Sequence, residues 1–267
     1  PPFLIHTPLI PFAGISAATG LEVLVKDEGQ QLTGSFKPRI LAPFLRSLAD
    51  PRARAGFARR IREITTGTTG NQGQSLALAV KLLREWYPET FKGLRATIFL
   101  ADDTPAVKEE EMKRLGADVQ KVPGLYPDAR TRAMARGRSP GVLYMSHSGP
   151  QYVSSYGSLA LEIVEDLIAR WKRQGLVPAT FDVERFFRLK VEEERGGLSE
   201  RAARALREIE QALEPLNHVA TIVPVGAGGI TSGVFVALKA LNPNITVIGV
   251  ASDRTASMYA SLEAGEL

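Results

Sequence analysis

The sequence predicts an α/β protein with two domains, each a mostly parallel sheet with helices on both faces. Short apolar segments of strand-like composition alternate with segments of helical periodicity, which is the pattern of parallel strands joined by helical crossovers. Apolar residues make up 44% of the 267 residues, enough for a substantial core. This length suits one large or two medium domains.

The first half of the chain carries regular strand and helix signals. An extended entry segment covers residues 1–9, and expected strands follow at 21–26, 63–66, 96–100, 118–122 and 142–145. Expected helices cover 40–48, 74–84, 126–135 and a stretch that ends at Leu115. The sequence Asp103-Thr-Pro105 would cap the helix that ends at Leu115, and Gly116 would stop it.

The second half contains an interruption. Helices are expected at 157–173, at 231–241 and from Ser257, and strands at 219–225 and 246–250. Between them, residues 175–217 break the α/β rhythm with a polar loop at 192–197 and a charged helical pattern at 198–213, which predicts a helical insertion on the surface. Because the α/β pattern stops abruptly at Leu267, we expect that C-terminal sequence is missing from this chain.

Composition excludes several classes of site. The chain has no cysteine, so disulfides, thiolate metal sites and a cysteine nucleophile are excluded. No apolar run reaches membrane-spanning length and no secretory pattern is present, so we expect a cytoplasmic protein without a membrane partner. The net charge is +4, and the arginines are scattered without interleaved aromatic residues, which argues against a nucleic-acid partner.

The segment Thr33-Gly-Ser-Phe-Lys-Pro-Arg39, the lysine turn, lies between an expected strand and an expected helix. Gly34 allows a sharp turn, and Pro38 suits the first position of the helix. Lys37 would therefore lie at the positive end of a helix, where the dipole and burial both disfavour the ammonium form. Such a lysine is a nucleophile towards aldehydes. For this motif alone, a solvated lysine on an ordinary turn is the alternative.

A second candidate, the glycine loop, joins an apolar strand to a helix. Its residues are Gly226, Ala227, Gly228, Gly229 and Ile230. Glycines let the backbone approach a phosphate closely, and a helix N-terminus favours an anion. A Walker loop would need Gly-Lys-Ser/Thr here, and a dinucleotide fingerprint would need glycine at Thr231 and an acid after the next strand. Both are absent, so we expect a single phosphate; a glycine turn without a ligand is the alternative.

A third candidate, the amide loop, offers hydroxyls, backbone donors and two side-chain amides. Its residues are Thr68, Thr69, Gly70, Asn71 and Gln72. This composition suits a carboxylate held without a full positive charge, plus one hydrogen bond to a ring hydroxyl. The alternative is a helix cap in which Thr68 or Thr69 is the capping residue.

Together, an activatable lysine, a carboxylate loop and a monophosphate loop are the three contacts that a pyridoxal-phosphate enzyme needs. Their order and spacing resemble fold-type II pyridoxal-phosphate enzymes, the tryptophan synthase β-subunit superfamily. The lysine turn is similar to that family's S-F-K-x-R motif, the amide loop to its S-x-G-N loop, and Val223–Gly229 to its tetraglycine loop. His6–Leu9 matches its T-P-L opening, and Asp103–Lys108 with Leu115–Ala117 resembles its small-domain helix.

Within the superfamily, the phenylalanine before the lysine and the Gly-Asn-Gln-Gly-Gln run resemble serine/threonine dehydratases more than cysteine synthases. The resemblance implies a large cofactor domain at residues 1–42 and 146–267, with the helical insertion at about 170–217. It also implies a small mobile domain at 43–145 that carries the amide loop. A homodimer is expected as well.

The resemblance implies that Lys37 holds pyridoxal 5'-phosphate as a Schiff base and removes the α-proton of an amino acid. The glycine loop would bind the phosphate, Asn71 would contact the cofactor ring, and the amide loop would hold the substrate carboxylate. Ala251 stands where several dehydratases have a glutamate that helps to bind a divalent cation, so no metal site is expected. The family's partner for the pyridine nitrogen would lie beyond Leu267.

The expected function is therefore β-elimination from a small hydroxy or β-substituted amino acid such as serine or threonine, by an ammonia-lyase. One alternative is a β-replacement transferase, threonine-synthase-like or cysteine-synthase-like, and another is a non-catalytic phosphate-binding or scaffold protein. Because no arginine adjoins the amide loop in sequence, serine and threonine are expected to bind better than aspartate or glutamate.

Overall fold

The computed structural model describes residues 3–146, 149–253 and 256–265, and the chain forms two compact units. Unit 1 contains Pro1–Thr7 and Asp27–Ser155, and unit 2 contains Pro8–Lys26 and Tyr156–Leu267. The lysine turn and the amide loop both belong to unit 1, and the glycine loop belongs to unit 2. The division into a cofactor domain and a mobile domain stays a prediction.

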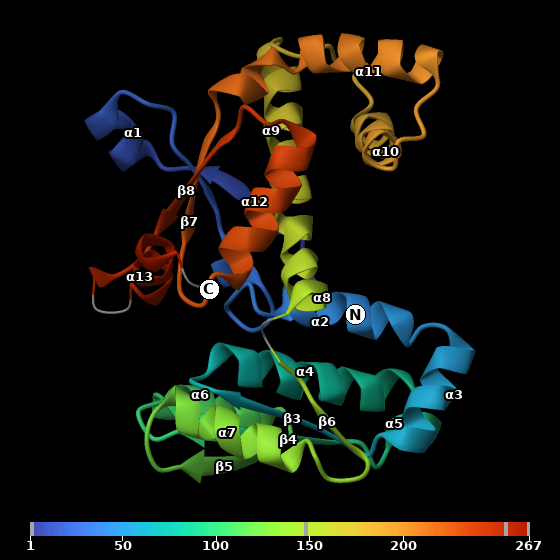
Figure 1. The fold of residues 1–267 in the computed structure, drawn as a ribbon, viewed down its shortest axis with the longest axis vertical. Coiled ribbons are helices and arrows are strands. Elements are labelled where there is room, and N and C mark those ends of the chain that lie inside the picture. Colours follow the sequence, from blue (N-terminus) through green and yellow to red (C-terminus); the bar gives the residue numbers. More distant parts are fainter. Residues whose placement is uncertain (1–2, 147–148, 254–255, 266–267) are drawn as a thin grey trace. The chain divides into compact units, whose positions relative to one another are not determined.

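Unit 1 is built on a parallel sheet with the strand order β5-β4-β3-β6 (Figure 1). The strands are β3 (Glu63–Thr68), β4 (Arg95–Ala101), β5 (Asp118–Val122) and β6 (Val142–Tyr144). The helices are α2 (Pro38–Ser47), α3 (Pro51–Arg60), α4 (Asn71–Trp86), α5 (Pro88–Phe91), α6 (Ala106–Arg114), α7 (Tyr126–Arg136) and α8 (Pro150–Val153), and the 3-10 helix η1 is Glu28–Gln30. The predicted α/β class and parallel pairing are confirmed in this unit.

The alternation of apolar residues along β4 explains why both faces of this sheet are covered. Ile98 and Leu100 are fully buried in a cluster with residues of α4 and α6. Phe99 points to the other face, where it packs with Ala129 and Ala133 of α7. Because successive side chains of a strand face opposite sides, one apolar strand anchors helices on both faces of the sheet.

Unit 2 contains two small sheets. Strands β1 (Leu9–Pro11) and β2 (Leu24–Lys26) pair antiparallel, and β7 (Ala220–Pro224) and β8 (Thr246–Val250) pair parallel. The helices are α1 (Ala13–Thr19), α9 (Gly157–Gln174), α10 (Val183–Glu194), α11 (Glu200–Ala212), α12 (Gly229–Leu241) and α13 (Ser257–Ala264), and the 3-10 helix η3 is Glu214–His218. Helix α9 packs along α12, and Gly157 allows this close approach because a Cβ there would lie 3.3 Å from that of Ala237.

The predicted insertion is a helical pair, α10 and α11, set off from the β7–β8 sheet (Figure 1). The Lys190 ammonium joins the two helices, at 2.8 Å from Glu193 and 2.9 Å from Glu210, and Phe186 and Leu206 are buried. One part of the prediction is wrong: Glu192–Glu194 are the last turn of α10 and not a loop. Their helical state follows from an amphipathic run that begins at the capping residue Asp182.

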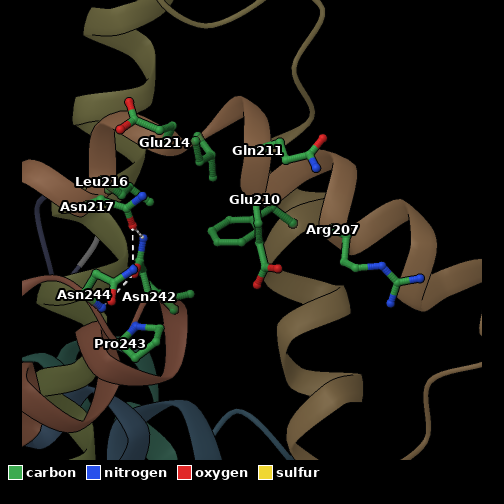
Figure 2. Close-up of a pocket in the computed structure, with 12 residues that line it drawn as sticks. Arg207, Glu210, Gln211, Glu214, Leu216, Asn217, Asn242, Pro243 and Asn244 are labelled. Carbon is green, nitrogen blue, oxygen red and sulfur yellow. Dashed lines mark hydrogen bonds between the residues drawn. The ribbon is translucent and has the colours of Figure 1, made fainter.

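The insertion also forms one wall of a cavity of about 530 Å³ in unit 2. Figure 2 shows Glu210 on the α11 side and three asparagines on the other side, where Asn242 and Asn244 both donate hydrogen bonds to Asn217. Leu213 and Leu216 are buried in its lining. None of the predicted cofactor or substrate residues lines this cavity.

Several short elements were not predicted. Helix α3 follows α2 almost directly, because Asp50 ends the preceding segment and caps the new helix by accepting a hydrogen bond from Ala53 N at 2.7 Å. Helices α1 and α5 are absent from the sequence-based prediction, and the strand expected at 21–26 is limited to Leu24–Lys26. Among the described residues, no helix is both long and apolar enough to cross a bilayer.

A buried ion pair fixes the start of α2 in unit 1. The Arg39 side chain has no solvent exposure, and its Nε and Nη2 donate to the two carboxylate oxygens of Glu28 at 2.6 and 2.7 Å. Thr7 Oγ1 donates to the same carboxylate at 2.5 Å. This two-point geometry requires a guanidinium, since an ammonium cannot supply two parallel N–H groups.

We predict that Arg39→Met lowers the free energy of unfolding by about 3–5 kcal/mol, because the Glu28 carboxylate then stays in unit 1 without its partner. Urea unfolding of the cofactor-free protein measures the change. Arg46→Met is the matched control, because Arg46 lies exposed in the last turn of the same helix. If Arg39→Met lowers the free energy of unfolding no more than Arg46→Met does, the stabilising role given to the ion pair is contradicted.

Candidate active site

Lys37 is the residue immediately before α2, as predicted. Gly34 has φ +66° and its N–H donates to Gln31 O at 2.8 Å, so the chain turns sharply before the lysine. Pro38 is the first residue of α2. Burial lowers the pKa of Lys37 from 10.5 to about 8. The predicted placement and the predicted direction of the pKa shift are confirmed, whereas the catalytic role of Lys37 stays a prediction.

Lys37 and the amide loop line one small cavity of unit 1, with a volume of about 150 Å³. Its lining residues are Lys37, Gly67, Thr68, Thr69, Asn71, Gln72, Lys108 and Tyr126. The topology of the sheet explains this convergence. Strands β3, β4 and β5 are adjacent and parallel, so the segments that follow them meet at one edge of the sheet. The structure therefore brings the predicted lysine and the predicted substrate loop together.

The amide loop leads directly into α4. Gly70, with φ +137°, is the residue before the helix and makes no side-chain cap, and the first helical bond runs from Gln74 N to Gly70 O. The N–H groups of the first turn therefore have no partner within the helix. Thr68 Oγ1 accepts a hydrogen bond from Gly70 N at 3.0 Å. The alternative in which Thr68 or Thr69 caps α4 is not observed.

The Gln72 carboxamide is the most unusual polar group of this cavity. Gln72 is 4% exposed, and neither Oε1 nor Nε2 has a hydrogen-bond partner among the described residues. A buried carboxamide without partners costs free energy, so such a group indicates that a ligand supplies them. Both a donor and an acceptor are available at this position.

Besides Gly67 at the end of β3, the lining residues Lys108 and Tyr126 were not predicted. Lys108 Nζ donates to Asn71 Oδ1 at 2.7 Å, so a positive charge that the sequence analysis did not anticipate lies beside the amide loop. How the loop would hold a carboxylate stays a prediction. Burial raises the pKa of Tyr126. Tyr144 adds a smaller increase to this pKa, and the positive charge of Arg130 opposes it. Lys108 lies in the first turn of α6, the helix that follows β4, and Tyr126 lies in the first turn of α7, the helix that follows β5. In the sheet, β4 is adjacent to β3, which leads into the amide loop, and β5 is adjacent to β4. That position in a parallel sheet is the signal that could have identified them.

The glycine loop of unit 2 joins β7 to α12. Gly229 and Ile230 belong to the first turn of α12, which therefore begins two residues earlier than predicted. Gly228 precedes the helix with φ +78°, a value that suits glycine, and it offers no side-chain cap. The N–H groups of the first turn are thus available to an anion, and the first helical bond runs from Ser232 N to Gly228 O.

A family model described as "Pyridoxal-phosphate dependent enzyme" matches residues 2–175. The chain belongs to this family. Members of the family use pyridoxal phosphate, so the family match confirms the resemblance and the predicted cofactor.

Individual relatives agree with the family assignment. The chain is 27% identical over 264 residues to an L-threonine ammonia-lyase of Thermotoga maritima, covering 98% of this chain and 50% of that relative. The chain spans about half the length of the curated relatives it matches. In structure it resembles threonine deaminase isoform 2 of Solanum lycopersicum, with a TM-score of 0.66, 23% identity and coverage of 99% and 55% of the two chains. It also resembles maize serine racemase, with a TM-score of 0.67, 21% identity and coverage of 100% and 62%. The two structural likenesses confirm the predicted fold.

Within each unit taken by itself, the residues present suit one part of pyridoxal phosphate. The buried Lys37 amine suits its aldehyde, and the orphaned Gln72 carboxamide provides polar contacts in the same cavity. In unit 2, the uncapped N-terminus of α12 with Gly228 at the left-handed position suits its phosphate. Among the described residues, no group of three or more histidines and acids is placed to hold a metal ion.

The lowered pKa of Lys37 predicts a pH-dependent stability. Between pH 8 and 10.5 the unfolded chain binds more protons at this site than the native state, so stability increases with pH in this window. Below about pH 8 the buried ammonium carries its full cost. We therefore predict that Lys37→Met stabilises the cofactor-free protein at pH 7, by up to about 3 kcal/mol, and that this gain shrinks towards pH 10.5.

Urea unfolding of both proteins at pH 7 and pH 10.5 measures the effect. Lys92→Met is the control, because Lys92 is exposed and a pH-independent difference is expected there. A stability difference at position 37 that is equal at the two pH values would show that the ammonium is not buried.

Proposed function

We propose that this protein is a pyridoxal-phosphate-dependent ammonia-lyase that eliminates the β-substituent of a small hydroxy amino acid such as serine or threonine. The observation that carries the proposal is the cavity that the half-buried Lys37 shares with the amide loop. An amine that is partly neutral near physiological pH lies beside a set of groups suited to a carboxylate. This is the pairing that chemistry at the α-carbon of an amino acid requires.

Each element has a separate role in this proposal. Pyridoxal phosphate, when bound, supplies an aldehyde that condenses with amines and a ring that takes up the electron pair left by the α-proton. Lys37 Nζ would hold the cofactor covalently and, once released by the substrate amine, would accept the α-proton. Thr68, Thr69, Gly70, Asn71 and Gln72 would orient the substrate carboxylate and the ring hydroxyl. Gly226, Ala227, Gly228, Gly229 and Ile230 would hold the phosphate through backbone N–H groups.

The direction of the chemistry is proposed from the relatives and from the motif. The Thermotoga maritima relative is named for the release of ammonia from threonine, and the Solanum lycopersicum structure is of a threonine deaminase. These names describe the activities of those two proteins. That this chain also catalyses β-elimination is part of our proposal. The predicted β-replacement activity is the alternative. The homodimer and the cytoplasmic location stay predictions.

Product analysis of the cofactor-loaded protein tests the proposal. With L-serine or L-threonine we expect equal amounts of a 2-keto acid and ammonia, measured by a dehydrogenase-coupled assay and an ammonia assay. We expect Lys37→Ala to lower turnover by about 10²–10⁴-fold, the contribution of a positioned general base, or more because the covalent link is also lost. A new amino acid formed only with an added thiol, without keto acid, would favour replacement. No reaction with any β-substituted amino acid would contradict the proposed function.

A further inference from the structure

Lys108 is a lysine of unit 1 with an unusual environment. Two other lysines close to it in the sequence are paired with one carboxylate: Lys113 and Lys121 lie 2.7 and 3.3 Å from Glu109. Lys108, in contrast, has no carboxylate partner among residues 3–146, 149–253 and 256–265. Its ammonium donates to the neutral Asn71 Oδ1 and lines the cavity that also contains Lys37.

The side chain of Lys108 lies across the backbone of the amide loop. A Cβ on residue 70 would lie 2.3 Å from Lys108 Cδ and 3.1 Å from its Nζ. Gly70 is required for its φ of +137°, and the flexible end of the lysine side chain occupies the space beside it. The ammonium is thus placed at the first turn of the sixteen-residue helix α4.

A cation at a helix N-terminus is electrostatically unfavourable, because the free N–H groups already carry partial positive charge. The sequence places a second positive group there and gives it no acid as a partner. An anion between the ammonium and the N–H groups of α4 would relieve this repulsion. The Gln72 carboxamide is buried, and neither its Oε1 nor its Nε2 has a hydrogen-bond partner among the described residues. This observation independently indicates that a ligand completes the same cavity.

We propose that Lys108 is the charged arm of the carboxylate subsite, pairing with the α-carboxylate of the substrate and leaving Asn71 Nδ2 as a donor towards the ligand. The inference rests on the proposed function and deepens it. It assigns the site to amino acids with a free α-carboxylate and excludes the corresponding amines, esters and amides. Because Lys108 would be engaged by the α-carboxylate, it does not by itself provide a partner for an acidic side chain.

The test compares L-serine with 2-aminoethanol, which lacks only the carboxylate. Binding of both to the cofactor-loaded protein is followed by the change in the absorbance spectrum of the cofactor. In Lys108→Gln, which keeps a donor for Asn71 but not the charge, serine affinity should fall about 10- to 100-fold, the size of a charge-assisted hydrogen bond. The affinity for 2-aminoethanol should stay within about twofold. Lys108→Arg should restore most of the preference for serine, and Lys113→Gln is the matched control on the same helix.

Equal weakening of both ligands in Lys108→Gln, or no weakening of serine, would overturn the proposal. If Lys108→Gln does not fold, Asn71→Asp provides the second variant. Its carboxylate would neutralise Lys108 from within the loop and should weaken serine more than 2-aminoethanol. An equal effect on the two ligands would again overturn the proposal.

A measurement on the cofactor-free protein separates this inference from the proposed function. Labelling of Lys37 by an amine-reactive reagent, followed by peptide mass spectrometry, gives the pH of half-labelling. Acetate should raise this pH in the wild type, because an anion beside Lys108 favours the charged form of Lys37, and should not raise it in Lys108→Gln. If acetate raises the pH of half-labelling but serine yields no keto acid, the carboxylate subsite at Lys108 is supported and the ammonia-lyase activity is contradicted. If serine yields keto acid but acetate has no effect and serine is not preferred over 2-aminoethanol, the ammonia-lyase activity is supported and the subsite at Lys108 is contradicted.

Discussion

The buried ion pair between Arg39 and Glu28 is the interaction on which the candidate active site depends. A guanidinium with no solvent exposure is stable only with a partner, and the two hydrogen bonds to Glu28 fix both its position and its orientation. Arg39 lies in the first turn of α2, two residues after Lys37. The ion pair therefore holds the start of α2 against η1. Lys37 is held in a half-buried position as a consequence, and its lowered pKa follows from the burial of its amine.

The parallel sheet of unit 1 explains why the other site residues lie where they do. Each strand is followed by a turn and a helix, so the carboxyl edge of the sheet collects the first turns of α4, α6 and α7. Those turns supply Asn71, Lys108 and Tyr126 to one cavity. Apart from Gly67 and Thr68 at the end of β3, the strands supply none of the residues that line this cavity. They fix the positions of segments that are polar, rich in glycine and open at the edge.

Much of the fold could be predicted because strong local signals agreed with the tertiary structure. The apolar periodicity identified α4 and α9, and Pro38 and Gly116 correctly marked a helix start and a helix end. Helix α3 could not be predicted in the same way, because its arginine-rich sequence has little apolar periodicity and is read as polar surface.

The candidate site was predictable where the residues are contiguous in sequence. The lysine turn, the amide loop and the glycine loop each carry their own signal of glycines, amides and helix starts. Lys108 and Tyr126 do not, because they join the site only through the order of strands in the sheet. Lys108 places a positive charge beside an amide loop whose own side chains are neutral. Arg39 likewise could be placed in a motif, whereas its burial against Glu28 depends on a contact outside that motif.

The central claim is that Lys37 is the amine that holds the cofactor. The most direct measurement is to load the protein with pyridoxal phosphate, reduce it with borohydride, and map the labelled peptide by mass spectrometry. The account predicts one stoichiometric label, on Lys37, and no label at that peptide in Lys37→Ala. A label on Lys108 or any other lysine, with Lys37 unmodified, would contradict it.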